Sequence, residues 1–225
     1  MAQPLDTVLY SQPGAELRTR SFTAHKGTID RVVKDAKPLV LKRPKIVVRG
    51  KEVGQPRDVG FFSDASTGYL YSQRIMEAQP LTDAMRDLLG MLNAAYGLQF
   101  NGLLINRYRN GKDSVGKHGD DEKGLDTTAG VVILSWGAER TFRLRQNRSG
   151  APIAKDTTTK RYHALQMHGA RFQKDLTHEI PKQLRIDGER VSITARRHLP
   201  TYEAMLTMHR ARAAARARRE AEAEA

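Results

Sequence analysis

The feature that most constrains the fold is a series of short, turn-bounded apolar segments that follows one strong helix pattern. The helix pattern runs from Thr82 to Tyr96: Thr82 is a good N-cap, apolar side chains recur at helical spacing, and Gly97 suits a C-terminal stop. The later segments have strand length and cover 102–108, 130–136, 140–146, 162–167, 170–176 and 190–197. This order predicts an α+β fold with a sandwich or jelly-roll core and helices packed on one face.

The two ends of the chain differ from this middle part. We interpret residues 1–45 as a flexible or loosely packed basic arm, because prolines and Gly14 interrupt any regular pattern. Residues 46–200 would form the folded domain. Residues 201–225 are rich in Ala, Arg and Glu, and we expect either an exposed, fraying helix or an additional nucleic-acid contact.

Charge and composition narrow the classes of function. The 225 residues carry a formal net charge of +13, from 38 Lys and Arg against 25 Asp and Glu. Such a balance favours polyanionic partners, of which nucleic acid is the commonest; a basic surface kept for solubility is the alternative. There is no cysteine, so a metal must use nitrogen and oxygen ligands. This agrees with an intracellular protein, in the nucleus, cytoplasm or an organelle matrix. No apolar run approaches the roughly 20 residues that cross a bilayer, so we expect no membrane association.

A small set of residues points to metal chemistry. His118 and Asp120 stand two positions apart and can point the same way on extended backbone; with His178 they make two imidazoles and a carboxylate, the ligand set of non-haem iron(II) oxygenases. A zinc site could use the same ligands, and His178 could also be an ordinary core or surface residue. Arg190 and Arg196 lie at even spacing on one predicted strand. Two inward-facing arginines need an anion, and a dicarboxylate co-substrate would provide it.

These motifs occur in a familiar order. Asn106-x-Tyr108, His118-x-Asp120, His178 and Arg190-x-x-x-Thr194-x-Arg196 resemble the AlkB family of Fe(II)- and 2-oxoglutarate-dependent dioxygenases, most closely its DNA-repair demethylase branch. The similarity runs from about Val48 to Arg197. It implies a double-stranded β-helix, or jelly-roll, core and an enzyme that oxidises N-methyl groups on nucleic-acid bases and releases formaldehyde.

The resemblance also implies roles for individual residues. His118, Asp120 and His178 would bind Fe(II), and 2-oxoglutarate would be held by Asn106, Tyr108, Arg190, Thr194 and Arg196. Tyr69 and Tyr71 match the aromatic pair of the family's lid strand, where one ring stacks on a flipped base opposite His118. A half-buried strand face is the other interpretation of this pair.

The turn after the metal motif offers two acidic candidates. Asp121 could accept a hydrogen bond from the exocyclic amine of the base, with Glu122 supporting it; a solvated acidic turn is the alternative. Arg49 stands where the duplex-repair branch carries a large apolar wedge, and an arginine stacks or binds phosphate instead. Single strands or RNA therefore stay open as substrates beside duplex DNA. The segment from Gly169 to His178, which contains Gln173, is shorter than in that branch, so we expect a different pocket wall.

Three functions follow from these patterns. The first is oxidative demethylation of alkylated bases in DNA or RNA. The second is an oxygenase that hydroxylates a base or a protein side chain and removes nothing. The third is a non-catalytic basic nucleic-acid-binding protein of a larger assembly. We expect a monomer, or a component of a nucleoprotein assembly.

Overall fold

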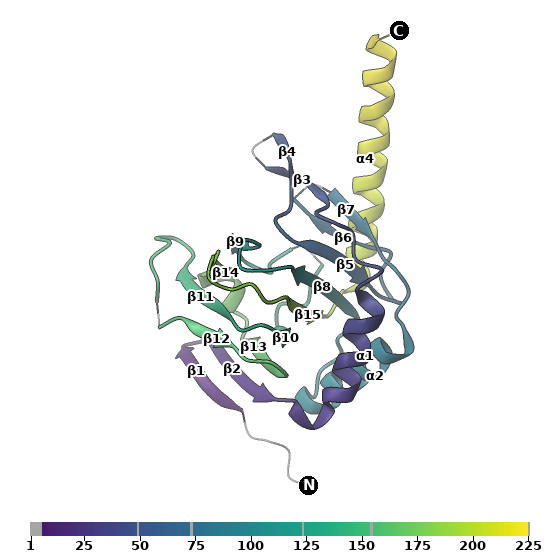
Figure 1. Ribbon diagram of the computed structural model, residues 1–225. Coiled ribbons are helices and arrows are strands. Elements are labelled where there is room, and N and C mark those ends of the chain that lie inside the picture. Colours follow the sequence, from purple (N-terminus) through teal and green to yellow (C-terminus); the bar gives the residue numbers. More distant parts are fainter. Residues whose placement is uncertain (1–5, 49, 73, 123, 154, 225) are drawn as a thin grey trace.

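Two antiparallel sheets face each other and form the body of the molecule (Figure 1). The computed structural model describes residues 6–224 except 49, 73, 123 and 154. The larger sheet has the order β1 (Thr7–Gln12), β2 (Ala15–Ser21), β13 (His163–His168), β10 (Val131–Gly137), β15 (Arg190–Arg196), β8 (Gly102–Tyr108) and β5 (Asp58–Phe62). The smaller sheet has the order β12 (Thr157–Thr159), β11 (Arg140–Gln146), β14 (Leu176–Ile180) and β9 (Val115–His118). The expected jelly-roll core is confirmed.

Strand β15 shows how the sequence places the site. Side chains of a strand alternate between its two faces. Val191, Ile193 and Ala195 therefore join the core beneath the helices, whereas the residues between them face the smaller sheet. The residues of β15 that face the smaller sheet are Arg190, Ser192, Thr194 and Arg196. One face of β15 is thus structural and the other is polar.

Two helices cover the outer face of the larger sheet. These are α1 (Lys26–Ala36) and α2 (Asp83–Tyr96), which pack on each other and on β8, β10 and β15. Helix α2 is the one that the sequence predicts: the Thr82 side chain accepts a hydrogen bond from the Met85 amide, and Gly97 ends the helix with a φ of +64°. The expectation of helices on one face is correct.

The N-terminal segment is not a flexible arm, and that interpretation is wrong. Strand β2 pairs with β13 over six residue pairs and buries Ala15 and Leu17, and a short 3-10 turn η1 (Thr23–His25) leads into α1. Helix α1 buries four apolar side chains at helical spacing, namely Ile29, Val32, Val33 and Ala36. Burial of this apolar surface outweighs the basic residues, which stay at the surface.

Two hairpins and a long helix stand at one end of the sheets. The hairpins are β3 (Lys45–Val48) with β4 (Lys51–Gly54), and β6 (Gly68–Tyr71) with β7 (Arg74–Glu77). Helix α4 (Pro200–Glu224) extends beyond the sheets beside them (Figure 1). Its first turns are not a loose tail, because Tyr202 and Leu206 are fully buried. Among the described residues, no helix combines the length and apolar character needed to cross a membrane.

One predicted strand is misplaced. Residues 170–176 contain a single helical turn, α3 (Phe172–Asp175), and the strand that follows is β14. Leu176 and Ile180 of β14 point into the core between the sheets, so the apolar alternation begins where the predicted strand was to end. The polar segment 147–159 also holds a short strand, β12, at the edge of the smaller sheet.

Candidate active site

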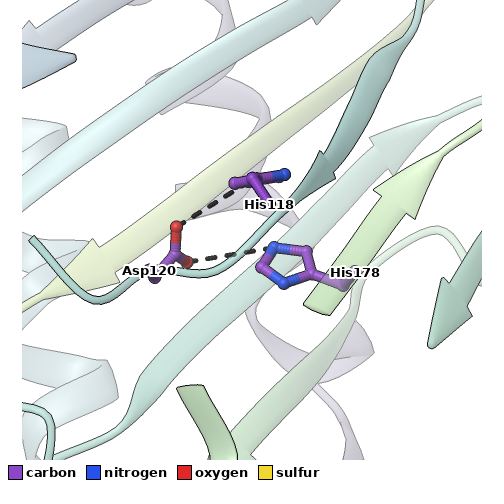
Figure 2. Close-up of side chains that lie close together, drawn as sticks. All are labelled: His118, Asp120 and His178. Carbon is purple, nitrogen blue, oxygen red and sulfur yellow. Dashed lines mark ion pairs between the residues drawn. The ribbon is translucent and has the colours of Figure 1, made fainter. Parts of the chain in front are cut away.

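Two paired strands of the smaller sheet bring the metal candidates together. His118 ends β9 and lies opposite His178 of β14, so the two rings are cross-strand neighbours with centroids 4.2 Å apart. Asp120 follows β9, and its two carboxylate oxygens lie 3.8 Å from His118 Nε2 and 3.9 Å from His178 Nε2 (Figure 2). One nitrogen or oxygen atom from each of the three residues lies within 4.8 Å of the others. The three side chains therefore converge on one point.

The protonation states suit a cation. Burial lowers the pKa of both histidines, that of His178 to about 3, so the imidazoles are neutral at pH 7. Burial raises the pKa of Asp120, but the attraction of Arg196 and the two histidines outweighs it and keeps the pKa below its usual value. Neutral imidazoles and an ionised carboxylate are the forms in which these side chains bind metals.

Surrounding groups fix the orientation of these side chains. The Nδ1 of His118 lies 2.9 Å from the Gly116 carbonyl, which as an acceptor leaves Nε2 without a proton. Arg196 Nη2 donates to Asp120 Oδ1 at 2.5 Å, and the Asp120 amide donates to Gln173 Oε1 at 2.9 Å. The second carboxylate oxygen of Asp120 is buried and finds no hydrogen-bond partner among the described residues. This unsatisfied oxygen, facing two neutral imidazoles, fits a divalent metal ion.

A cavity, partly open to solvent, begins at the metal candidates and extends between the sheets. Strands β8 and β15 supply its floor, in the register that sets Arg190 against Tyr108 and Ser192 against Asn106. The expected 2-oxoglutarate residues line it: Asn106, Tyr108, Arg190, Thr194 and Arg196. All five are buried. The structure thus brings them together around one space.

The two arginines of β15 have different surroundings. Arg196 is neutralised by Asp120 and also donates to the Tyr69 hydroxyl at 2.6 Å. Arg190 is 1% exposed and lies beside the Tyr108 ring; its Nη2 donates to Ser135 Oγ at 3.0 Å, whereas its Nε and Nη1 find no acceptor among the described residues. A buried guanidinium with unpaired donors requires an anion. We expected one dicarboxylate to neutralise both arginines. Because Asp120 already neutralises Arg196, only Arg190 needs a carboxylate of the co-substrate.

Comparison with known proteins identifies this arrangement. Residues 30–196 match the model of the 2OG-Fe(II) oxygenase superfamily. The chain belongs to this superfamily. Iron(II) is accordingly the metal that His118, Asp120 and His178 fit, and 2-oxoglutarate is the co-substrate that the cavity around Arg190 fits. The alternative of a zinc site is set aside.

The chain is also similar to named AlkB homologues. It is 30% identical over 179 residues to the DNA oxidative demethylase ALKBH2 of Arabidopsis thaliana, covering 68% of this chain and 57% of that protein. It is 33% identical over 153 residues to the alpha-ketoglutarate-dependent dioxygenase alkB homolog 3 of Homo sapiens, covering 65% and 53%. The chain therefore spans little more than half the length of these two relatives. The solved structure of OsALKBH1 matches with a TM-score of 0.54 at 16% identity, over 84% of this chain and all of that one, which supports the fold.

Two residues of this site were not among those predicted. Arg57, buried just before β5, lines the cavity and donates through Nε to Asn106 Oδ1 at 2.7 Å. A lone arginine beside Pro56 gives no periodic signal. Gln173 had been noted only as a change in the pocket wall, but its side chain holds the backbone of Asp120.

The expected substrate residues lie at unequal depths. Tyr69 is buried and its hydroxyl donates to Glu122 Oε1 at 2.5 Å, so it belongs to the network that ends at Asp120. Tyr71 is half-buried, lines the cavity and stacks on Tyr69 with centroids 6.2 Å apart. Burial raises the pKa of Glu122, despite the nearby positive charge of Arg196. Asp121 is exposed and is not among the described residues that line the cavity. Arg49 lies outside the described residues.

Proposed function

We propose that this protein is an Fe(II)- and 2-oxoglutarate-dependent dioxygenase that demethylates alkylated bases in nucleic acid. The observation that carries the proposal is the convergence of His118, Asp120 and His178 at one end of a cavity that contains the guanidinium of Arg190, whose Nε and Nη1 have no partner among the described residues. The names of its relatives, a DNA oxidative demethylase and an alkB homolog, support a nucleic-acid substrate. The net charge of +13 supports it as well.

The chemistry divides between the bound groups and the chain. Iron(II) with 2-oxoglutarate would supply the oxidising power: 2-oxoglutarate and O₂ yield succinate and CO₂, and one oxygen atom enters a C–H bond of the N-methyl group. The resulting N–CH₂–OH group then loses formaldehyde, and its hydroxyl proton returns to the base nitrogen. His118, Asp120 and His178 would hold the iron.

The remaining cavity residues bind and shield. The free N–H groups of Arg190 suit a carboxylate of 2-oxoglutarate, and the Tyr108 ring packs against that guanidinium. Apolar side chains keep water from the interior, namely Ile133, Phe142 and Ile180. Tyr71 and the part-exposed ring of His118 lie at the cavity wall, where a flipped base would stack.

A direct assay tests the reaction. The protein is supplied with iron(II), 2-oxoglutarate and N-methylated oligonucleotides as single-stranded DNA, duplex DNA and RNA, and formaldehyde and succinate are measured. We expect both products from at least one substrate and neither from the His178→Ala variant. A stable gain of one oxygen, seen by mass spectrometry, would indicate hydroxylation without demethylation. Absence of succinate with every substrate would refute the proposal.

The role of Arg190 has its own readout. Arg190→Ala removes a charge-assisted bond worth about 1.5–3 kcal/mol, so the KM for 2-oxoglutarate should rise roughly 10- to 100-fold. Turnover should recover largely at saturating 2-oxoglutarate, because the iron ligands are untouched. Arg143→Ala, a partly exposed arginine on the smaller sheet that is paired with Asp156, is the matched control and should leave the KM unchanged. An unchanged KM in Arg190→Ala would contradict this assignment.

A further inference from the structure

One stretch of α4, residues 211–219, is strongly basic and exposed, and three glutamates follow it, Glu220, Glu222 and Glu224. Residues 211–219 contain four arginines and no acidic residue, and all four are exposed: Arg212, Arg216, Arg218 and Arg219. This part of α4 extends past the sheets, on the side where the two hairpins lie (Figure 1). The superfamily match ends at residue 196, before the helix begins. The basic surface is therefore a property of this chain beyond the matched region.

A groove separates this helix from the hairpins. The residues that line it are Val47, Gly50, Glu52 and Arg74 from the hairpin side and His209, Arg212, Ala213, Arg216 and Ala217 from α4. Arg212 and Arg216 are one helical turn, or about 6 Å, apart and so face the same side. Glu52 already pairs with Lys45 and with Arg74. Among the described groove residues there are three arginines and one carboxylate, which gives the groove a positive balance.

The groove adjoins the wall of the active-site cavity. Hairpin β6–β7 contributes Tyr69, Tyr71 and Met76 to the cavity, whereas Arg74, at the start of β7, lines the groove. Arg74 is paired with Tyr71 across the hairpin, so the groove and the cavity meet at the end of this hairpin. A strand whose base entered the cavity would have its neighbouring backbone close to this hairpin.

Helix α4 packs on the β6–β7 hairpin. The Tyr202 hydroxyl accepts a hydrogen bond from the Leu70 amide at 2.9 Å, and Leu206 is fully buried. The Glu203 carboxylate accepts hydrogen bonds from Ser66 and Thr67. Arg210 forms an ion pair with Glu77 of β7. The arginines that follow are therefore at a fixed position relative to the cavity.

We propose that this groove binds the sugar-phosphate backbone of the nucleic-acid strand whose base occupies the cavity. The inference rests on the proposed function and extends it to a contact outside the active site. Phosphate contacts position a nucleic acid without reading its sequence, and arginine is well suited to them. The positive balance of the groove is complementary to a polyanion.

A pair of charge-matched variants tests the groove. The first is Arg212→Ala with Arg216→Ala; the control is Arg218→Ala with Arg219→Ala, two arginines of the same helix that are not among the described groove residues. Both remove two positive charges and keep good helix formers. Binding of an unmethylated single-stranded 20-mer is followed by fluorescence anisotropy over a range of salt concentrations.

The slope of log K against log salt decides the outcome. The groove variant should lower its magnitude by roughly 1.4, for two lost phosphate contacts on a single strand, and the control by clearly less. Equal reductions would mean unspecific attraction by the whole helix and would overturn the proposal. An unchanged slope in the groove variant would also overturn it and would point to another occupant, such as an acidic protein.

A second measurement separates this inference from the proposed function. The binding assay needs neither iron nor a methyl group, so a protein that releases no formaldehyde can still pass it. With methylated substrates, the groove variant should raise the KM for a 20-mer but leave turnover of a methylated nucleoside unchanged, because a nucleoside has no phosphate for the groove to bind. An unchanged KM for the 20-mer, with normal formaldehyde release, would contradict the groove and leave the enzyme intact.

Discussion

Charged side chains of the same types have opposite surroundings in the cavity interior and on the exposed hairpins at the groove, which we call the rim (Glu52 and Arg74). In the interior, Asp120, Arg190 and Arg196 are 1–4% exposed, and each has a defined partner or an unpaired atom facing the cavity. On the hairpins at the groove, Arg74 and Glu52 pair with each other, and their side chains are 53% and 45% exposed. A buried charge is costly unless compensated, whereas an exposed pair contributes little. Removing one interior charge should therefore destabilise the fold, whereas the rim charges contribute little to stability and can contact a nucleic acid.

The largest expected effect lies in the interior. Asp120→Asn leaves the buried Arg196 without its counter-charge, and we expect it to lower the free energy of unfolding by about 3 kcal/mol. Urea denaturation of the metal-free protein measures this. Combining Asp120→Asn with Arg196→Met should restore most of the loss, because both charges are then gone. A double variant less stable than Asp120→Asn alone would contradict the claim that the interior charges depend on one another.

A pH effect of intermediate size is expected from His198. Burial, with the nearby charge of Arg196, lowers the pKa of this histidine to about 3 in the folded protein. The unfolded chain, with a pKa near 6.5, takes up a proton that the folded protein does not, so stability is complete above pH 6.5 and declines below it. Between pH 7 and pH 5 this amounts to about 2 kcal/mol. Urea denaturation at both pH values should show a correspondingly smaller drop for His198→Gln; an identical drop would contradict the assignment.

The smallest effect belongs to the rim. Arg74→Ala breaks an exposed ion pair, and the free energy of unfolding should change by less than about 1 kcal/mol in urea denaturation. The same substitution removes one groove arginine, so affinity for nucleic acid should fall, most clearly at low salt. A loss of stability comparable to that of Asp120→Asn would mean that the rim is built like the interior.

Local patterns predicted the elements that carry their own signals. Helix α2 has an N-cap, an apolar stripe and a terminal glycine, and the structure agrees within a residue. Helix α1 carried the same apolar spacing, but the surrounding prolines and lysines led to its interpretation as part of an arm. Strand β14 was displaced because its alternating apolar residues begin only after the helical turn α3.

The active site could be predicted only in part from the residues themselves. His118 and His178 meet because β9 pairs with β14, a contact between distant segments that no spacing along the chain encodes. Their assignment came from the family resemblance. The environments of Arg190 and Arg196, identical in pattern, differ because only Arg196 lies within reach of Asp120. Arg57 carried no pattern at all.

The attachment of α4 has a practical consequence for cloning. Tyr202 and Leu206 fill the same apolar cluster as Val59, Phe61 and Tyr69. A fragment cut at residue 196, where the superfamily match stops, would leave that cluster open to water and free the strand that bears Tyr69 and Tyr71. Expression fragments of this protein should therefore retain the helix at least through Arg210.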